Sequence, residues 1–206
     1  KGKEVFKFGF GQSPFKIPED VINELRNHAF QNKYLPMQGL PELRESIASY
    51  ISFKKNYNYK AENILIGPGT KELMFLLQIL FDGEVILPTP SWVSYEPQAI
   101  LGRNKVHWIE TKRENNWFPT AYQLEKKIKS IKKKNLIFIL NSPNNPSGTV
   151  CKNLKELAAV AKKYNLIVLS DEIYTDLTFC NKYDSISKFY PEKTFISGGL
   201  SKWCGA

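Results

Sequence analysis

Five short segments of this sequence carry side chains that could perform chemistry together. They are Gly-Pro-Gly-Thr-Lys at 67–71, Pro-Thr-Pro-Ser-Trp at 88–92, Asn-Ser-Pro-Asn-Asn at 141–145, Asp-Glu-Ile-Tyr at 171–174 and Gly-Gly-Leu-Ser-Lys at 198–202. The set offers an anion cradle, a flat aromatic ring, an amide, a carboxylate with a phenol, and a lysine amine. Each segment follows a short apolar run, and ligands of parallel sheets bind at that position, beyond the carboxyl ends of the strands.

The apolar runs alternate along the chain with segments of helical periodicity. Strands are predicted at 63–67, 84–88, 105–110, 136–140, 166–170 and 193–197. Helices are predicted at 18–30, 40–56, 69–81 and 153–165, and across the lysine-rich stretch 125–134. Strands separated by helices predict an α/β fold, with a mainly parallel sheet that helices sandwich on both faces.

Several common chemistries do not fit these segments. The loop at 67–71 lacks the Gly-x-x-x-x-Gly-Lys-Ser/Thr spacing of a phosphate-binding loop, and no Gly-x-Gly-x-x-Gly follows a predicted strand. Neither His28 nor His107 lies at a suitable strand exit, which argues against a Ser-His-Asp hydrolase. The three cysteines are odd in number and scattered, so neither a metal site nor a disulfide framework is expected.

Pyridoxal 5'-phosphate (PLP) would use every group in the set. Its aldehyde needs a lysine amine, its pyridinium nitrogen needs a carboxylate, and its phosphate suits a helix N-terminus. Its ring face packs well against a flat aromatic, and its phenolic oxygen accepts hydrogen bonds from an amide and a hydroxyl. The residues therefore predict PLP as the cofactor.

Six motifs resemble those of the class I/II aminotransferases, which are PLP enzymes of fold type I. They occur in the family's order across nearly the whole chain: NKYLPMQGLPELRESIASYI, GPGTKELMFLLQILF, PTPSWVSY, NSPNNPSGTV, SDEIY and GLSK. The resemblance, which is strongest to aspartate aminotransferases of bacterial type, implies transfer of an amino group from an L-amino acid to a 2-oxo acid. Aspartate or a broad range of donors is expected. Two alternatives stay open, namely a PLP lyase or synthase on the same fold, and a non-catalytic segment that binds PLP or a partner.

The resemblance also implies roles for single residues. Lys202 is expected to hold PLP covalently and, once released, to move the proton at the substrate Cα. Asp171 would keep the pyridine nitrogen protonated, and Tyr174 and Asn145 would face the phenolic oxygen. Trp92 would stack on the ring.

Other residues are expected to hold the phosphate and the substrate. Gly69, Thr70 and Lys71 open a predicted helix whose backbone N–H groups would cup the phosphate. Tyr34 resembles the tyrosine that reaches the phosphate of the neighbouring subunit, which implies a homodimer with shared active sites. Gly11 matches the glycine near the substrate carboxylate, and Asn145 is the second predicted substrate contact.

The sequence departs from the family pattern after Lys202. It stops at Ala206, although relatives carry a phosphate-binding arginine and a substrate-binding arginine further on. Gly199 stands where many relatives have a phosphate-binding serine. The expectation is a truncated segment, with 1–18 belonging to the small domain and 19–206 forming an incomplete PLP-binding large domain. Such a segment would be weak or inactive alone, and its exposed apolar edge would make it aggregation-prone or dependent on dimerisation.

Composition narrows the setting and the partners. Hydrophobic residues make up 42% and charged residues 24%, as in ordinary globular proteins. No apolar stretch approaches the roughly 18–20 residues of a membrane span, and no secretory signal opens the chain, so a cytoplasmic protein without a membrane partner is expected. Much of the net charge of +9 lies at 125–134, where Leu124, Ile128 and Ile131 share a predicted helix face. Proteins that bind nucleic acids usually place aromatic or arginine side chains among such lysines to contact the bases, and none lies here, so no nucleic-acid binding is predicted.

Overall fold

A five-stranded parallel sheet forms the centre of the computed structural model, which describes residues 4–5, 11, 13, 15–55, 57–179 and 183–205. The strand order is β2-β1-β3-β4-β5, and every neighbouring pair is parallel. The strands are β1 (Glu84–Thr89), β2 (Lys105–Glu110), β3 (Leu136–Asn141), β4 (Ile167–Asp171) and β5 (Thr194–Ser197). Five of the six predicted strands are therefore confirmed, within one residue at each end.

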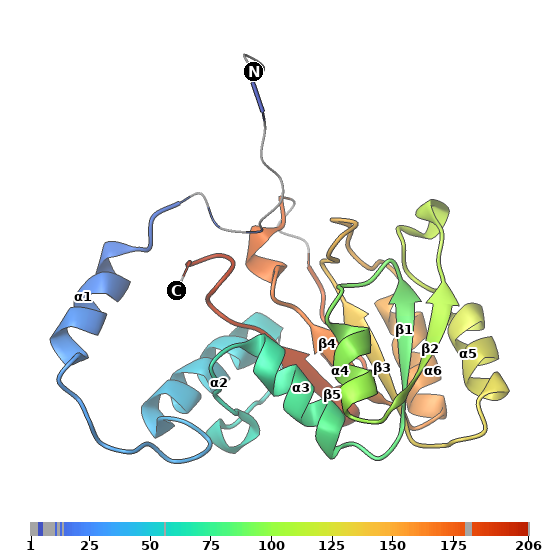
Figure 1. Cartoon of the computed structure of the whole chain (residues 1–206), viewed down its shortest axis with the longest axis horizontal. Coiled ribbons are helices and arrows are strands. Elements are labelled where there is room, and N and C mark those ends of the chain that lie inside the picture. The colour runs from blue at the N-terminus through green and yellow to red at the C-terminus, as the bar shows by residue number, and fades with distance from the viewer. Residues whose placement is uncertain are drawn as a thin grey trace.

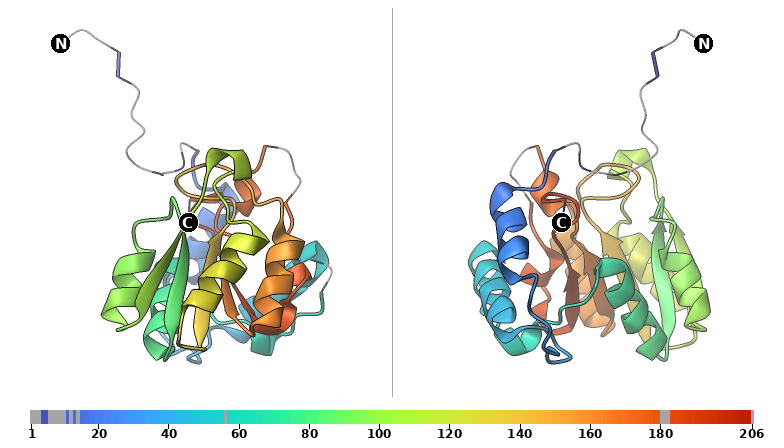
Figure 2. Two further views of the ribbon diagram at one scale, coloured as in Figure 1. Left: turned by 90° about the vertical axis from the view of Figure 1, so that its right-hand side faces the viewer. Right: turned by 60° about the vertical axis from the view of Figure 1, so that its left-hand side comes forward.

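Helices flank both faces of the sheet (Figures 1 and 2). The helices are α1 (Glu19–His28), α2 (Pro41–Lys55), α3 (Thr70–Leu80), α4 (Tyr95–Leu101), α5 (Ala121–Ser130) and α6 (Leu154–Lys163). Of these, α3 and α4 pack on one face of the sheet, and α5 and α6 pack on the other. Short 3₁₀ helices lie at Ala61–Asn63, Arg113–Asn115, Thr175–Leu177, Ile186–Lys188 and Pro191–Lys193. In the described part of the chain, no helix is both long enough and apolar enough to cross a membrane.

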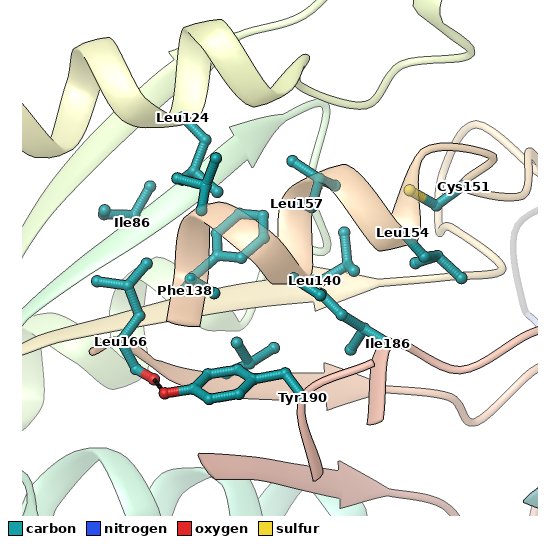
Figure 3. Close-up of a cluster of buried hydrophobic side chains, with 14 of the residues drawn as sticks. Ile86, Leu124, Phe138, Leu140, Cys151, Leu154, Leu157, Leu166, Ile186 and Tyr190 are labelled. Carbon is teal, nitrogen blue, oxygen red and sulfur yellow. Dashed lines mark hydrogen bonds between the residues drawn. The ribbon is translucent and has the colours of Figure 1, made fainter. Parts of the chain in front are cut away.

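Two apolar clusters hold the helices onto the sheet. On one face Phe138 packs with residues of α5 and α6, such as Leu124 and Leu157, in the cluster drawn in Figure 3. On the other face Ile137 and Val85 pack with residues of α3 and α4. Neighbouring residues of β3 thus serve opposite clusters, because successive side chains of a strand point to opposite faces. All six residues of β3 are buried, as expected for a strand covered on both sides.

The lysine-rich helix begins earlier and ends earlier than predicted. Thr120 caps α5 through a capping box with Gln123, and Leu124 and Ile128 are buried as expected. The helix ends at Ser130, so the three lysines at 132–134 lie beyond it. Extension of this helix to 134 was wrong, although the lysines there are exposed as predicted.

The strand predicted at 63–67 was also wrong. Residues 61–63 form a 3₁₀ helix, and no ladder includes 64–67 among the described pairs. Ile64 has extended backbone angles, and the Ile66 N–H donates to the Gln38 carbonyl at 3.0 Å. The apolar pattern thus produced extended backbone without the neighbouring strand that a ladder needs.

Helix α4 was not predicted from the sequence. Its segment carries Pro97, which weakens a helical pattern in a short stretch. Pro97 is the third residue of α4, within the first turn, where the missing N–H has no intrahelical partner to lose. The predicted N-terminal segment 1–18 lies mostly outside the described residues, and the domain boundary there stays a prediction.

Candidate active site

The predicted site residues follow the carboxyl ends of neighbouring strands. The chain order of the sheet reverses at β1, because β2 lies on one side of it and β3 on the other. Crevices beyond such a reversal are the usual ligand sites of open parallel sheets. Trp92 follows β1, Asn145 follows β3, Asp171 ends β4, Tyr174 lies just after it, and Lys202 follows β5.

Asp171 is a buried carboxylate with a donor on each oxygen. Only 3% of the residue is exposed. Tyr95 donates from its hydroxyl to Oδ2 at 2.5 Å, and the Ile173 N–H donates to Oδ1 at 3.2 Å. Burial raises the pKa of Asp171 above its ordinary value, while the two hydrogen bonds and the charge of Lys202 act in the opposite direction.

Tyr95 belongs to this site and was missed from the sequence. It is the first residue of α4 and is 1% exposed. It is the last residue of the motif PTPSWVSY, three positions after Trp92. The available signal was the helical spacing of these two aromatics, but the helix itself was not predicted.

Asn145 and Tyr174, both predicted to face the phenolic oxygen, lie side by side. The Asn145 side-chain amide donates to the Tyr174 hydroxyl at 3.3 Å. Burial raises the pKa of Tyr174, and the hydrogen bond from Asn145 lowers it. The pair therefore presents an amide and a protonated phenol side by side, and both are hydrogen-bond donors.

Loop 141–150 is held by its own amides, which explains why an asparagine-rich segment follows a buried strand. The Asn145 N–H donates to the Asn141 side chain at 2.7 Å, and Asn141 donates in turn to the Asp171 carbonyl at 3.0 Å. The Asn144 N–H donates to the Thr149 carbonyl at 2.9 Å, which closes the loop. Gly148 has a φ of +68°, a conformation that favours glycine.

Lys202 lies next to Tyr174 and Gly11. Its Nζ is 5.8 Å from the centroid of the Tyr174 ring and donates to the Gly11 carbonyl at 3.3 Å. The structure therefore brings Gly11, predicted to lie near the substrate, to the lysine predicted to carry the cofactor.

Trp92 and Lys71 lie together next to Tyr95, on the side of the site formed by α3 and α4. The Trp92 ring meets the Tyr95 ring edge to face, with centroids 5.3 Å apart and planes at 78°. Lys71 places Nζ 5.2 Å from the Trp92 ring centroid. The Gln98 side chain donates to the Lys71 carbonyl at 2.9 Å, which ties the first turn of α3 to α4.

The N-terminus of α3 lies beside the exit of β5. Gly69 is the N-cap of α3 with a φ of +119°, and a Cβ built there would meet nothing within 4 Å. A Cβ built on Gly199 would lie 3.6 Å from the Thr70 methyl group. The first-turn N–H groups predicted to hold a phosphate are therefore next to the strand exit that leads to Lys202.

Tyr34 is the one predicted site residue that the described contacts do not join to the others. It lies between α1 and α2 and is fully exposed. Its predicted role depends on a second subunit, and that role stays a prediction.

The arrangement fits PLP. A buried carboxylate is costly unless a positive partner compensates it, and a protonated ring nitrogen supplies such a partner. The lysine amine, the paired amide and phenol, the indole and the open helix N-terminus match the remaining groups of the cofactor. Among the residues that the structure describes, no cluster of three histidine, cysteine or acidic side chains could hold a metal ion.

Comparisons with known proteins give the same family. The profile of the family "Aminotransferase class I and II" matches residues 3–206. An aspartate aminotransferase of Bacillus subtilis is 33% identical over 98% of this chain and 53% of its own length. An asparagine–oxo-acid transaminase of Streptococcus mutans is 33% identical over 98% of this chain and 54% of its own length. The structure of the Thermus thermophilus aspartate aminotransferase with maleate superposes with a TM-score of 0.87, at 30% identity over 95% of this chain and 54% of that one.

The chain spans about half the length of the relatives it matches. The fold prediction is confirmed, because the parallel sheet with helices on both faces corresponds to part of the fold of these aminotransferases. PLP is the cofactor of this family, so the cofactor predicted from the residues agrees with it. By sequence and by fold, the chain belongs to the class I and II aminotransferases.

Proposed function

We propose that the protein containing this chain is a PLP-dependent aminotransferase that moves an amino group from an L-amino acid to a 2-oxo acid. The observation that carries the proposal is the meeting of Asp171, the Asn145–Tyr174 pair and Lys202 at one edge of the sheet. Relatives named for aspartate and for asparagine favour a four-carbon donor, with a broad range as the wider form of the proposal.

Each residue has a distinct task in this proposal. When bound, PLP supplies an electron sink for the pair left at the substrate Cα. Lys202 binds the cofactor covalently and, once released, takes the proton from the substrate Cα and returns it. Asp171 balances the positive charge of the ring nitrogen, and Asn145 and Tyr174 donate to the phenolic oxygen.

The remaining groups orient the cofactor and the substrate. The first turn of α3, from Gly69 to Lys71, binds the phosphate, and Trp92 packs against the ring. Gly11 and Asn145 contact the substrate carboxylate. These residues take no part in bond making or breaking; they hold the cofactor and the substrate so that the reacting atoms are aligned.

The proposal includes a homodimer and a place in cytoplasmic amino acid biosynthesis. Tyr34 is exposed within one chain, which leaves it free to reach the phosphate site of a second subunit. The site of each subunit is then complete only in the dimer.

The test is a single half-reaction with the PLP-loaded protein and L-aspartate. We expect one equivalent of the 2-oxo acid per site, with the amino group retained on the cofactor, and we expect neither from Lys202→Ala. In a parallel assay with an S-alkyl-L-cysteine, release of ammonia, pyruvate and the thiol, with no amino group left on the cofactor, would instead identify a lyase. Bound PLP without any 2-oxo acid from L-aspartate, L-asparagine or a panel of other L-amino acids would identify a non-catalytic binding protein, and either result contradicts the proposal.

A further inference from the structure

The hydroxyl of Tyr95 makes the shorter of the two hydrogen bonds to the Asp171 carboxylate. It lies 2.5 Å from Oδ2, whereas the Ile173 N–H lies 3.2 Å from Oδ1. Both partners of the shorter bond are buried, at 1% and 3% exposure. A hydrogen bond to a charged group in such surroundings is stronger than one between neutral groups in water.

The Tyr95 ring is fixed by its packing. It begins α4, belongs to the buried cluster that contains Met74 and Leu87, and meets the edge of Trp92. One turn later Gln98 bonds to the Lys71 carbonyl and accepts from Gln78 at 2.9 Å, which anchors α4 to α3. The hydroxyl is therefore held on the carboxylate by the helix pair.

Tyr95 acts as a donor only. Burial and the nearby charge of Asp171 raise its pKa above the ordinary value, so the phenol keeps its proton at any working pH. A fixed donor stabilises the ionised carboxylate and does nothing comparable for the protonated acid. Tyr95 thus opposes the effect of burial on Asp171.

The other titratable groups around Asp171 act from a distance. Lys202 and Glu172 affect it through their charges, with opposite signs. The Glu172 carboxylate accepts from the Ser170 hydroxyl at 2.9 Å and also from Ser185. Tyr174 lies close enough to affect the pKa of Tyr95, and its hydroxyl accepts from Asn145. Among the residues that the structure describes, Tyr95 is the side-chain donor to the Asp171 carboxylate.

We propose that Tyr95 is a positioning residue that keeps Asp171 ionised and aimed at the ring nitrogen of the cofactor. This inference rests on the proposed function. Two bases, Asp171 and the ring nitrogen, compete for one proton. Because Tyr95 stabilises the carboxylate, it leaves the proton on the ring, where it strengthens the electron sink.

The test compares Tyr95→Phe with Tyr190→Phe in the full protein. Tyr190 is a matched control, since it is also buried and donates its hydroxyl to the Leu166 carbonyl at 3.1 Å in the opposite cluster (Figure 3). With ¹⁵N-labelled PLP bound, we expect the ring nitrogen resonance of Tyr95→Phe to move toward the unprotonated position. We also expect kcat to fall about tenfold with little change in KM, as loss of one hydrogen bond to a charged group predicts.

An unchanged nitrogen resonance in Tyr95→Phe, or an equal change in Tyr190→Phe, would overturn the inference. A second readout does not need the cofactor, namely the ¹³C titration of the Asp171 carboxyl in the ligand-free protein. We expect its midpoint to move to higher pH in Tyr95→Phe and to stay in place in Tyr190→Phe, and an unmoved midpoint in Tyr95→Phe would also overturn the inference. Failure of the wild-type protein to bind PLP would instead count against the proposed function.

Discussion

At the scale of single residues, the proposed function and the burial of Asp171 favour opposite protonation states of its carboxyl group. The proposed chemistry needs an ionised carboxylate, yet burial raises its pKa in the ligand-free chain. An acid with a raised pKa in the folded state binds its proton more tightly there than in the unfolded chain. The free energy of unfolding therefore falls as pH rises from the pKa of Asp171 in the unfolded chain to its pKa in the folded chain. Above both pKa values, the full loss of stability caused by the buried charge is present.

Removal of this charge should stabilise the ligand-free protein. Asp171→Asn keeps the size of the side chain and can still hydrogen-bond with Tyr95 and Ile173. We expect its melting temperature at pH 7 to rise by about 2–4 °C, which corresponds to roughly 1 kcal/mol in a chain of this size. PLP binding should weaken at the same time. Calorimetry of the ligand-free protein checks the first part, and a lower melting temperature than wild type would contradict it.

The side chains of the site were predictable to different degrees. Lys202, Asp171, Tyr174 and Asn145 follow predicted strands, and parallel strands bring their carboxyl ends to one edge, so their meeting followed from the pattern. Tyr95 was not predictable in this way. Its contact with Asp171 depends on how α4 turns after the prolines, which is a matter of packing and not of sequence periodicity.

At the scale of elements, the start of α5 is stabilised by hydrogen bonds between neighbouring residues of the sequence. The Thr120 side chain accepts from the Gln123 N–H at 3.2 Å, and the Gln123 side chain accepts from the Thr120 N–H at 2.9 Å. These bonds satisfy donors that the helix itself leaves without partners.

We expect Thr120→Ala to lower the free energy of unfolding by about 1 kcal/mol, while Thr120→Ser retains most of it. Urea unfolding of the two variants measures the difference. Equal losses in both would show that the methyl group of Thr120, and not its hydroxyl, stabilises the start of α5.

Apart from α1, the correctly predicted elements combine an apolar pattern with a neighbour in the sheet or a face to pack against. Strand β3 and helix α6 have long patterns and buried faces that agree with them. The segment at 63–67 has the pattern of a strand, but a strand also needs a neighbour, and neighbours are set by the whole sheet. Helix α4 is seven residues long and carries Pro97 in its first turn, so its sequence gives no periodic signal.

At the scale of the whole molecule, the N-terminal elements leave apolar surface uncovered. Figure 1 shows α1 at the opposite end of the molecule from α5, and α1 contains no buried residue. Leu25, Phe30, Met37 and Phe53 are exposed along α1, the connection to α2 and α2 itself. Surface of this kind commonly marks a contact with another chain, and in the proposed dimer it faces the second subunit.

Charge on this surface should separate the subunits. We expect the double variant Phe30→Glu, Met37→Glu to sediment as a monomer at concentrations where the wild-type protein is a dimer, because burial of two charges at an interface is costly. Tyr122→Glu on α5 is the control, since Tyr122 is also a large exposed side chain but lies on a helix at the other end of the molecule. Identical sedimentation of the double variant and the wild type would place the interface elsewhere.

The measurement that tests the account most directly is borohydride reduction of the protein in the presence of PLP, followed by intact mass and peptide mapping. We predict one pyridoxyl group per chain, on Lys202, and none in the Lys202→Ala variant. Lys71 is the informative competitor, because it lies on the same side of the site against Trp92. An adduct on Lys71 or on surface lysines, or no adduct at all, would contradict the assignment of this edge of the sheet as a PLP site.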